Sequence, residues 1–252
     1  MQPLDIDKGD WRLQTTTHTA EDWVSPWTGS KSPKGSRVTV VSIIKLTKKK
    51  LLTVPLPNAT AAMLNASANA YEKARTLRVD SGIDKTLKNE VSFHSESKAL
   101  DYIERMIEAI VLAFSAVEAF TNETIPADFK YARHKRSEIV LEIANKETIE
   151  RYLSIDEKLT SVLPKIIGCK SPKGTHCWQG YKQLKDTRDR IIHMKTEDRK
   201  SAGPDVDTIW KAIVLAPAPH IAAKMIIDHF VKAMANKPQW HARFLKSDLT
   251  RC

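Results

Sequence analysis

The sequence predicts a mainly α-helical fold with a small β-hairpin-containing extension at its N-terminus, on three observations. Apolar residues recur at helical spacing through most of the chain after residue 57, most regularly between residues 98 and 124. Before residue 57, one stretch alternates in the manner of a strand and is rich in β-branched residues. The 8 glycines among 252 residues are too few for a Gly-rich β array. We therefore expect an N-terminal extension over residues 1–57 and a helical domain over residues 58–252.

The N-terminal extension is predicted to hold one β-hairpin. Residues 1–36 contain three tryptophans among Thr, Ser, Pro and Gly, which indicates irregular structure with short strands around residues 11–17. Residues 37–47 favour a strand, and residues 51–56 favour a return strand in which Pro55 marks an edge. The three lysines at 48–50 are typical of a solvated turn, and a nucleic-acid contact is the less favoured alternative.

The pentapeptide Lys-Ser-Pro-Lys-Gly occurs twice, at residues 31–35 and 170–174. Because Pro and Gly so close together are ordinary in turns, we interpret the repeat as turn-forming sequence rather than as a repeated phosphate-binding loop.

A series of helices is predicted to follow. Asn58 is a candidate N-cap for the first, and Ser95 or Ser97 for the longest. Pro126 and Gly168 end helices, and residues 79–94 form a loop or a short third strand. The expected helices cover residues 58–78, 98–124, 133–145, 147–152, 155–167, 177–197, 205–214 and 219–236.

Charge and composition restrict the class of protein. No apolar run approaches the roughly 20 residues that cross a bilayer, and the chain does not start like a secretory signal. Three cysteines cannot all pair within one chain, and without an export signal we expect them to be reduced thiols in the cytoplasm. Because no run is long enough to cross a bilayer, we expect no membrane partner. The net charge of +10 favours a polyanionic partner such as nucleic acid. Residues 1–97 carry 14 Lys and Arg against 10 Asp and Glu, and residues 98–252 carry 26 against 20, so the surplus is no basic tail.

Several kinds of chemistry lack their usual sequence motif. The chain has no phosphate-binding loop, no dinucleotide fingerprint, no nucleophile elbow and no H-E-x-x-H. Cys169, His176 and Cys177 do not form paired C-x-x-C half-sites. We therefore expect no cofactor and no metal, and any catalysis would use a few side chains alone.

The helix expected at residues 177–197 has a charged residue on its apolar face. Arg188 lies in the stripe formed by Tyr181, Leu184 and Ile191. A guanidinium that faces a core needs a partner, and Glu118 lies on the apolar side of the long helix, with Asn122 one turn further on. The sequence predicts a Glu118–Arg188 pair. The alternative is a buried salt bridge that fixes helix register and has no further function.

A histidine nearby suggests chemistry. His193 follows Arg188 by five residues, and Asp189 precedes the histidine by four, where its carboxylate could orient the imidazole. A cation that holds phosphate beside an imidazole that moves protons is the minimum for metal-free RNA cleavage.

Arg188-Asp189-Arg190-Ile191-Ile192-His193 resembles the Arg-x4-His motif of the HEPN superfamily, late in a helical domain. Residues 115–126, Ser-Ala-Val-Glu-Ala-Phe-Thr-Asn-Glu-Thr-Ile-Pro, look like that family's helix with a Glu and an Asn, and residues 159–168 look like the helix before the motif. The resemblance covers roughly residues 95–200. One departure is Lys195, which stands where some members carry a tyrosine two residues after the histidine.

The resemblance implies a helical bundle that forms a homodimer with both motifs in one cleft. It implies a metal-independent endoribonuclease of the toxin–antitoxin or anti-phage defence kind, acting on RNA such as tRNA or mRNA, with an antitoxin or regulatory protein as a partner. Carried over by position, Arg188 and His193 are catalytic and Asp189 assists, with Glu118 and Asn122 supporting them. Arg190, Lys195 and Lys185 are weaker candidates for RNA binding. The alternative is a non-catalytic helical module that binds RNA or a protein, as an adaptor or antitoxin.

Overall fold

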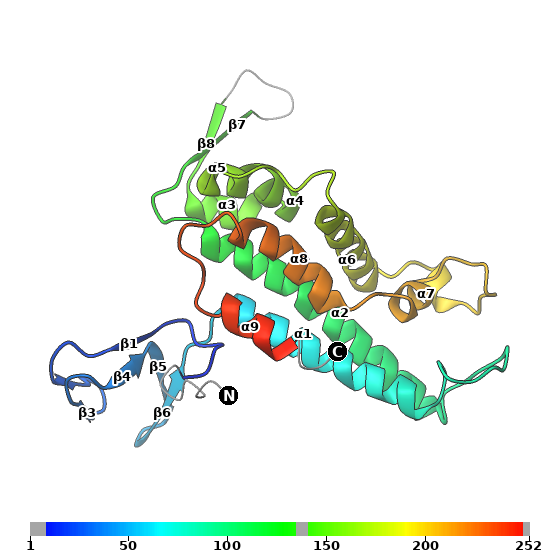
Figure 1. Ribbon diagram of the computed structural model, residues 1–252, viewed down its shortest axis with the longest axis horizontal. Helices are drawn as coiled ribbons and strands as arrows, with labels where there is room; N and C mark the ends of the chain where they lie inside the picture. The colour runs from blue at the N-terminus through cyan, green and yellow to red at the C-terminus, as the bar shows by residue number, and fades with distance from the viewer. Residues whose placement is uncertain (1–8, 135–140, 249–252) are drawn as a thin grey trace. The chain divides into compact units, whose positions relative to one another are not determined.

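The structure, a computed structural model, describes residues 9–134 and 141–248 and is mainly α-helical, as predicted (Figure 1). The chain divides into two compact units. One contains residues up to 62 together with those from 236 onward, and the other contains residues 63–235. The predicted division into 1–57 and 58–252 differs from these units, because the C-terminal helix groups with the N-terminal strands.

The N-terminal unit is built from antiparallel pairs of short strands. β1 (Thr16–His18) pairs with β4 (Arg37–Thr39), and β2 (Trp23–Val24) pairs with β3 (Lys31–Ser32). β5 (Val41–Thr47) pairs with β6 (Lys50–Pro55) and confirms the predicted hairpin. The predicted strand over 37–47 is divided at Val40, because its first part pairs with β1 and its second with β6. Val40 itself accepts a hydrogen bond from the Leu56 N–H at 2.9 Å.

A helix that the sequence did not predict completes this unit. α9 (His241–Asp248) is held by the ring of Phe244, whose centroid lies 5.4 Å from that of Trp11, and by a hydrogen bond of 2.6 Å from Arg243 to the Gly9 carbonyl. The helix is too short for its apolar spacing to stand out in the sequence.

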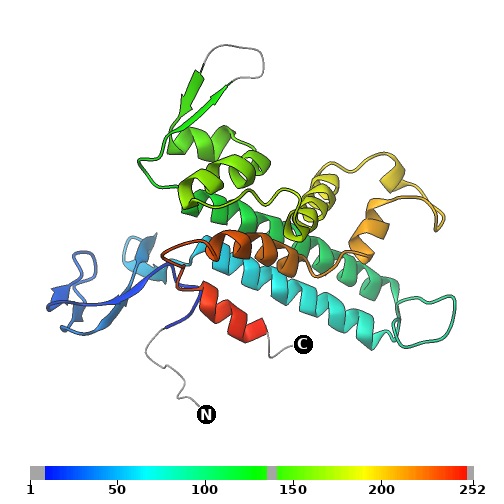
Figure 2. The ribbon, with the colours of Figure 1, turned by 45° about the horizontal axis from the view of Figure 1, so that its top comes forward.

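Long helices form the core of the second unit. α1 (Ala59–Asp80) starts at the predicted cap, where Asn58 Oδ1 accepts the Ala61 N–H at 2.9 Å. α2 (Glu96–Thr124) starts at Ser95, one of the two predicted caps, and ends just before Pro126. α6 (His176–Ile192) and α8 (Pro219–Val231) pack on α2 and on each other, and Figures 1 and 2 show α8 lying along α2. α1 continues to Asp80 rather than ending at residue 78, and residues 81–94 form the predicted loop.

The predicted helix over residues 133–145 is wrong within the described residues. β7 (Tyr131–His134) and β8 (Leu141–Ala144) form an antiparallel pair there. The opposed residues Tyr131 and Ala144 are buried, whereas Ala132 and Ile143, opposed on the other face, are exposed. Burial therefore alternates with a period of two, which a strand satisfies and a helix does not.

Other helices end earlier or start later than predicted. α3 (Lys146–Tyr152) follows β8, and the helix expected over 155–167 is present as α4 (Ile155–Glu157), a π-helical turn over Lys158–Val162 and α5 (Leu163–Ile167). It ends at Gly168, whose φ of 74° favours glycine. α6 stops at Ile192 rather than 197, α7 covers Ile209–Val214 rather than 205–214, and α8 stops at Val231 rather than 236.

A buried tyrosine fixes α6 against α4. The Tyr181 hydroxyl donates to Asp156 Oδ1 at 2.6 Å, and Lys182 Nζ donates to Asp156 Oδ2 at 3.1 Å. Burial acts to raise the pKa of Asp156, but the hydrogen bonds from Tyr181 and Lys182 outweigh it and hold that pKa below its usual range.

We predict that Asp156 contributes stability that acid removes. Because its pKa is lower in the folded state, the contribution is complete above the ordinary Asp pKa and is lost as pH falls through the folded-state value. Asp156→Asn should reduce the free energy of unfolding by about 1–2 kcal/mol at pH 7, and the difference from wild type should shrink below about pH 4, as measured by urea denaturation. Asp205→Asn, at an exposed carboxyl group, is the control. A difference that stays constant down to pH 3 would contradict the assignment.

Candidate functional site

The predicted site lies on the C-terminal half of α6. This helix begins where Thr175 Oγ1 accepts the Trp178 N–H at 3.3 Å. Arg188 forms an ion pair with its neighbour, Nη1 lying 2.8 Å from Asp189 Oδ1. Lys185, one turn earlier, holds the other oxygen of Asp189 at 2.8 Å. One carboxylate thus lies between two cations.

The guanidinium of Arg188 also lies on an aromatic ring. Its central carbon is 3.7 Å from the centroid of Phe114 on α2. A cation placed over a ring face is stabilised by the ring's quadrupole. The Arg188 side chain is 25% exposed, and its Nε is buried with no hydrogen-bond partner among the described residues. The prediction that Arg188 faces the core side of α6 is confirmed by this contact.

The predicted partner of Arg188 is wrong. Glu118 is exposed, and within the described residues Arg188 is paired with Asp189. The reason lies in the rotation of α2. Phe114, one turn before Glu118, covers the guanidinium, while Val117 and Phe120 point into the core and leave Glu118 on the outer side of the helix.

Asn122 instead holds a buried lysine. Lys158, which is 1% exposed, donates from Nζ to Asn122 Oδ1 and to the Glu150 carbonyl, both at 2.8 Å. Burial lowers the pKa of Lys158, against the attraction of Glu118 and Glu150, which acts to raise it. Lys158 is a residue of this arrangement that the sequence did not predict. Its signal is that a lysine occupies the helix face shared by Leu159 and Val162.

His193 ends α6 as its C-cap and is exposed. Its backbone N–H donates to the Asp189 carbonyl at 2.9 Å. The Asp189 carboxylate is engaged by Lys185 and Arg188. Asp189 is therefore placed to orient Arg188, and the predicted contact between its carboxylate and the imidazole of His193 is absent from the described structure.

Arg190 has a structural partner that the sequence did not reveal. Asp198, whose side chain is fully buried, accepts from Arg190 Nη2 at 3.0 Å and from the backbone N–H of Ile209 and Lys195. Arg190 also pairs with Asp207 at 3.1 Å. Its guanidinium therefore ties the segment after α6 to the start of α7. Lys195, by contrast, is exposed.

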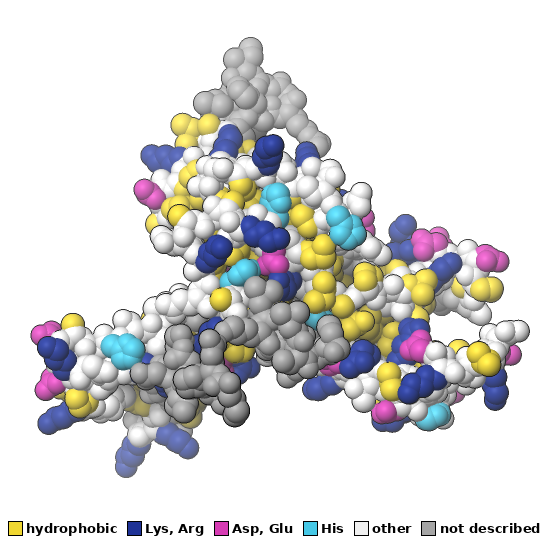
Figure 3. All heavy atoms as spheres, in the orientation of Figure 1, with side chains coloured by type: hydrophobic (Ala, Val, Ile, Leu, Met, Phe, Trp, Pro, Cys, Tyr) yellow, Lys and Arg dark blue, Asp and Glu magenta, His cyan; other side chains and the backbone are white. Residues whose placement is uncertain are grey.

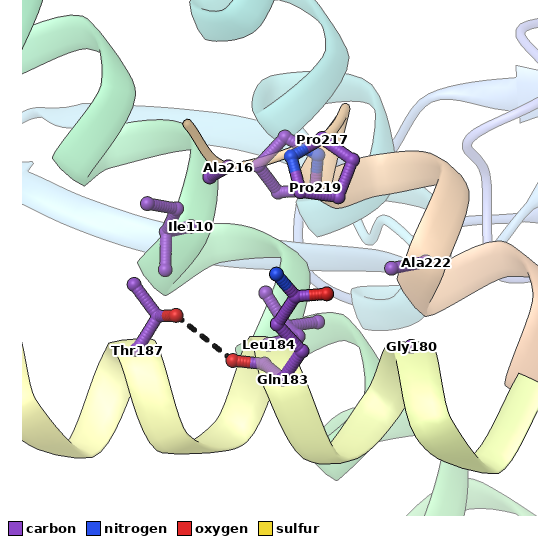
Figure 4. A pocket seen from close by; sticks show the side chains of 9 residues that line it. All are labelled: Ile110, Gly180, Gln183, Leu184, Thr187, Ala216, Pro217, Pro219 and Ala222. Atoms are coloured by element: carbon purple, nitrogen blue, oxygen red, sulfur yellow. Dashed lines mark hydrogen bonds between the residues drawn. The ribbon is translucent and has the colours of Figure 1, made fainter. Parts of the chain in front are cut away.

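A groove runs along another face of α6. It lies between the N-terminal halves of α6 and α8 and has a volume of about 510 Å³. A smaller pocket of about 20 Å³ continues it along α6 as far as Thr187, and Figure 4 shows this pocket between α6 and the Ala216–Pro219 segment. Gly180 faces Ala222 across the two helices, and a Cβ atom added at Gly180 would lie 3.8 Å from the Ala222 methyl carbon, an ordinary van der Waals distance. The larger groove is lined by His176, Cys177, Gln179, Gly180, Gln183, Pro217, Ala218, Ile221, Ala222 and Met225.

The described residues hold no cluster of three or more His, Cys, Asp or Glu that could bind a metal ion, and no described helix is both long and apolar enough to cross a membrane. No protein-family model matches the sequence, and comparisons with curated proteins and with solved structures give no match.

We predict that Asn122 and Glu118 differ in their effect on stability. Asn122→Ala removes an acceptor from the buried ammonium of Lys158 and should lower the free energy of unfolding by about 2 kcal/mol. Glu118→Ala changes an exposed position on the same helix and should alter it by less than about 0.5 kcal/mol. Chemical denaturation of the two variants at pH 7 compares them directly. Equal losses would mean that Lys158 does not depend on the Asn122 bond.

Proposed function

We propose that the protein is a metal-independent endoribonuclease of the HEPN kind. The observation that supports this most is the fixed position of Arg188. Its guanidinium is held by Asp189 and the Phe114 ring, and an exposed His193 follows at the end of the same helix. A cation held in place and an accessible imidazole are the two groups that RNA cleavage without metal needs.

The proposed reaction uses the RNA's own nucleophile. The 2′-oxygen attacks the adjacent phosphorus, the P–O2′ bond forms and the P–O5′ bond breaks, which leaves a 2′,3′-cyclic phosphate. His193 accepts the 2′-OH proton, and the departing 5′-oxygen takes up a proton from solvent water. Arg188 stabilises the extra negative charge on the phosphorane through the N–H groups that Asp189 does not occupy. Asp189 is a positioning residue in this scheme, since it holds Arg188.

The proposal includes a homodimer whose two Arg188–His193 pairs share one cleft. It also includes action in the cytoplasm as a toxin or anti-phage effector, under an antitoxin or regulatory protein. Ile192, next to His193, is 56% exposed, and an exposed aliphatic side chain within the motif suits a subunit contact.

A non-catalytic module that binds RNA or a protein is the second candidate. It is favoured by the close pairing of Arg188 with Asp189 and by the absence, within the described residues, of a hydrogen bond between Asp189's carboxylate and His193. Such a protein would bind its partner equally well with and without the imidazole.

We predict that the purified protein cleaves RNA in the presence of EDTA and leaves 2′,3′-cyclic phosphate ends. His193→Ala should reduce the cleavage rate by about 10²- to 10⁴-fold, the usual contribution of general acid–base catalysis. It should leave the melting temperature within about 1 °C of wild type, since the side chain is exposed. Gel analysis of labelled RNA and thermal unfolding measure the two effects.

His94→Ala, at an exposed histidine in the loop before α2, is the matched control and should cleave like wild type. Arg188→Lys keeps a positive charge but not the planar group over Phe114, so it should retain less than about a tenth of the activity. Cleavage unchanged in His193→Ala would exclude this histidine from catalysis, and tight RNA binding without cleavage would favour the second candidate.

Assembly gives an independent prediction. At micromolar concentration the protein should scatter light as a dimer of its 28.4 kDa chain. Ile192→Asp should shift it toward monomer and lower cleavage together, because both depend on the shared cleft. A wild-type protein that cleaves RNA as a monomer would contradict the composite site.

A further inference from the structure

Basic residues in the N-terminal unit are largely without acidic partners. Residues 9–62 carry eight Lys and Arg against three Asp and Glu, whereas residues 63–235 carry 27 against 24. Arg12 pairs with Asp10. None of the other seven cations forms an ion pair within the described structure, and all seven are exposed: Lys31, Lys34, Arg37, Lys45, Lys48, Lys49 and Lys50. Figure 3 shows Lys and Arg side chains gathered at the lower edge of this unit.

Two tryptophans are exposed among these cations. Trp27 is 68% exposed and Trp23 is 46% exposed. Trp23 opposes Ser32 in the β2–β3 pair, and the next residue, Val24, opposes Lys31. Exposed indole rings close to unpaired lysines are unusual for a surface that contacts only water, and both ring face and ammonium suit a ligand that carries bases and phosphates.

The loop that carries Trp27 is held in one shape. The Ser25 N–H donates to the Ser30 carbonyl and the Gly29 N–H donates to the Ser25 carbonyl, both at 2.9 Å, and the Ser25 side chain accepts from the Thr28 N–H at 3.3 Å. A ring presented by a preformed loop loses little conformational entropy when a base stacks on it.

Lys34 is presented by an ordered turn as well. The Ser36 N–H donates to the Pro33 carbonyl at 3.0 Å, and Gly35 has a φ of 82°. The second copy of Lys-Ser-Pro-Lys-Gly forms the same turn, since the Thr175 N–H donates to the Pro172 carbonyl at 3.1 Å and Gly174 has a φ of 80°. The interpretation of the repeat as turn-forming is therefore confirmed. Only the first copy lies in the unit with unpaired cations and exposed tryptophans, so the second serves as an internal control.

We propose that the N-terminal unit binds single-stranded nucleic acid, with bases stacked on Trp23 and Trp27 and phosphates held by the lysines of the β2–β3 and β5–β6 hairpins. Single strands are favoured over duplexes because a base must be unpaired on at least one face to stack on an indole ring. A lipid surface is the alternative that the test must separate, because Leu46 and Leu51, beside the lysines at the far end of the β5–β6 hairpin, are 50% and 48% exposed. This binding is separate from the proposed cleavage and does not rest on it.

The test uses full-length protein and a fluorescein-labelled oligo(dT) of about 15 nucleotides, matched to the usual span of a single-strand site. Oligo(dT) lacks the 2′-OH and cannot be cleaved by the proposed reaction, so loss of catalysis would not affect the result. Fluorescence anisotropy should show that binding weakens as salt is added. A plot of log Kd against log salt concentration should be linear, with a slope of about 0.7 for each phosphate contact. The same sequence as a duplex should bind at least about fivefold more weakly.

Trp27→Ala should weaken oligo(dT) binding by about 5- to 150-fold, the equivalent of about 1–3 kcal/mol for one stacked base. Trp27→Phe should restore much of it. Lys48, Lys49 and Lys50 changed together to Ala should lower the salt slope by up to about 2. Two double variants compare the two copies of the pentapeptide. Lys31→Ala with Lys34→Ala should weaken oligo(dT) binding. Lys170→Ala with Lys173→Ala should change Kd by less than about twofold.

Equal effects of the two matched double variants would overturn the proposal, because binding would then follow net charge alone. Equal affinity for the duplex and the single strand would also overturn it. Binding to phosphatidylserine vesicles without binding to oligo(dT) would assign the surface to lipid instead. Circular dichroism of every variant checks that the strands have formed.

Discussion

The ring of Phe114 fixes the position of α6 and so of the candidate-site residues that α6 carries. Phe114 lies on α2, and its ring centroid is 6.3 Å from that of Tyr181 on α6, with the two rings nearly parallel. The same ring lies under the guanidinium of Arg188, which is two turns after Tyr181 on α6. Two contacts seven residues apart determine both the rotation and the height of α6 on α2. Because Tyr181 is tied in turn to Asp156, the same ring connects α2, α6 and α4. A change at Phe114 would therefore move the candidate site as well as loosen the core.

Charged side chains complete this arrangement from within the fold. Lys158 is buried against Asn122 and the Glu150 carbonyl, and Asp198 is buried against Arg190 and two backbone N–H groups. Each buried charge is matched by several hydrogen bonds, as burial of a charge requires. The consequence is that many cations of the helical unit are already engaged by acidic groups or carbonyls, whereas those of the N-terminal hairpins are not.

The sequence could predict those features that depend on local spacing. The caps at Asn58 and Ser95, the β5–β6 hairpin and the position of Arg188 on the core side of α6 each follow from a few neighbouring residues. The partner of Arg188 could not be predicted in the same way. Glu118 and Phe114 are one turn apart, and which of them meets the guanidinium depends on the rotation of α2 about its axis, which tertiary packing decides. The β7–β8 pair escaped prediction because its short segments contain residues that suit either a helix or a strand, and only the cross-strand pairing of Tyr131 with Ala144 distinguishes them.

The repeated pentapeptide shows why local structure and function separate in this protein. Both copies form the same glycine-dependent turn with the same hydrogen bond. The first copy links β3 to β4, among exposed tryptophans and cations without ion pairs. The second leads into the N-cap of α6 at Thr175, and its Lys170 carbonyl is bonded to His229 at 2.8 Å. The same five residues thus present Lys34 on a basic surface in the first copy and lead into a helix in the second copy. The chemistry available to each copy is set by its neighbours and not by the turn. The net charge of +10 for the whole chain therefore says less about a partner than does the location of the cations without ion pairs.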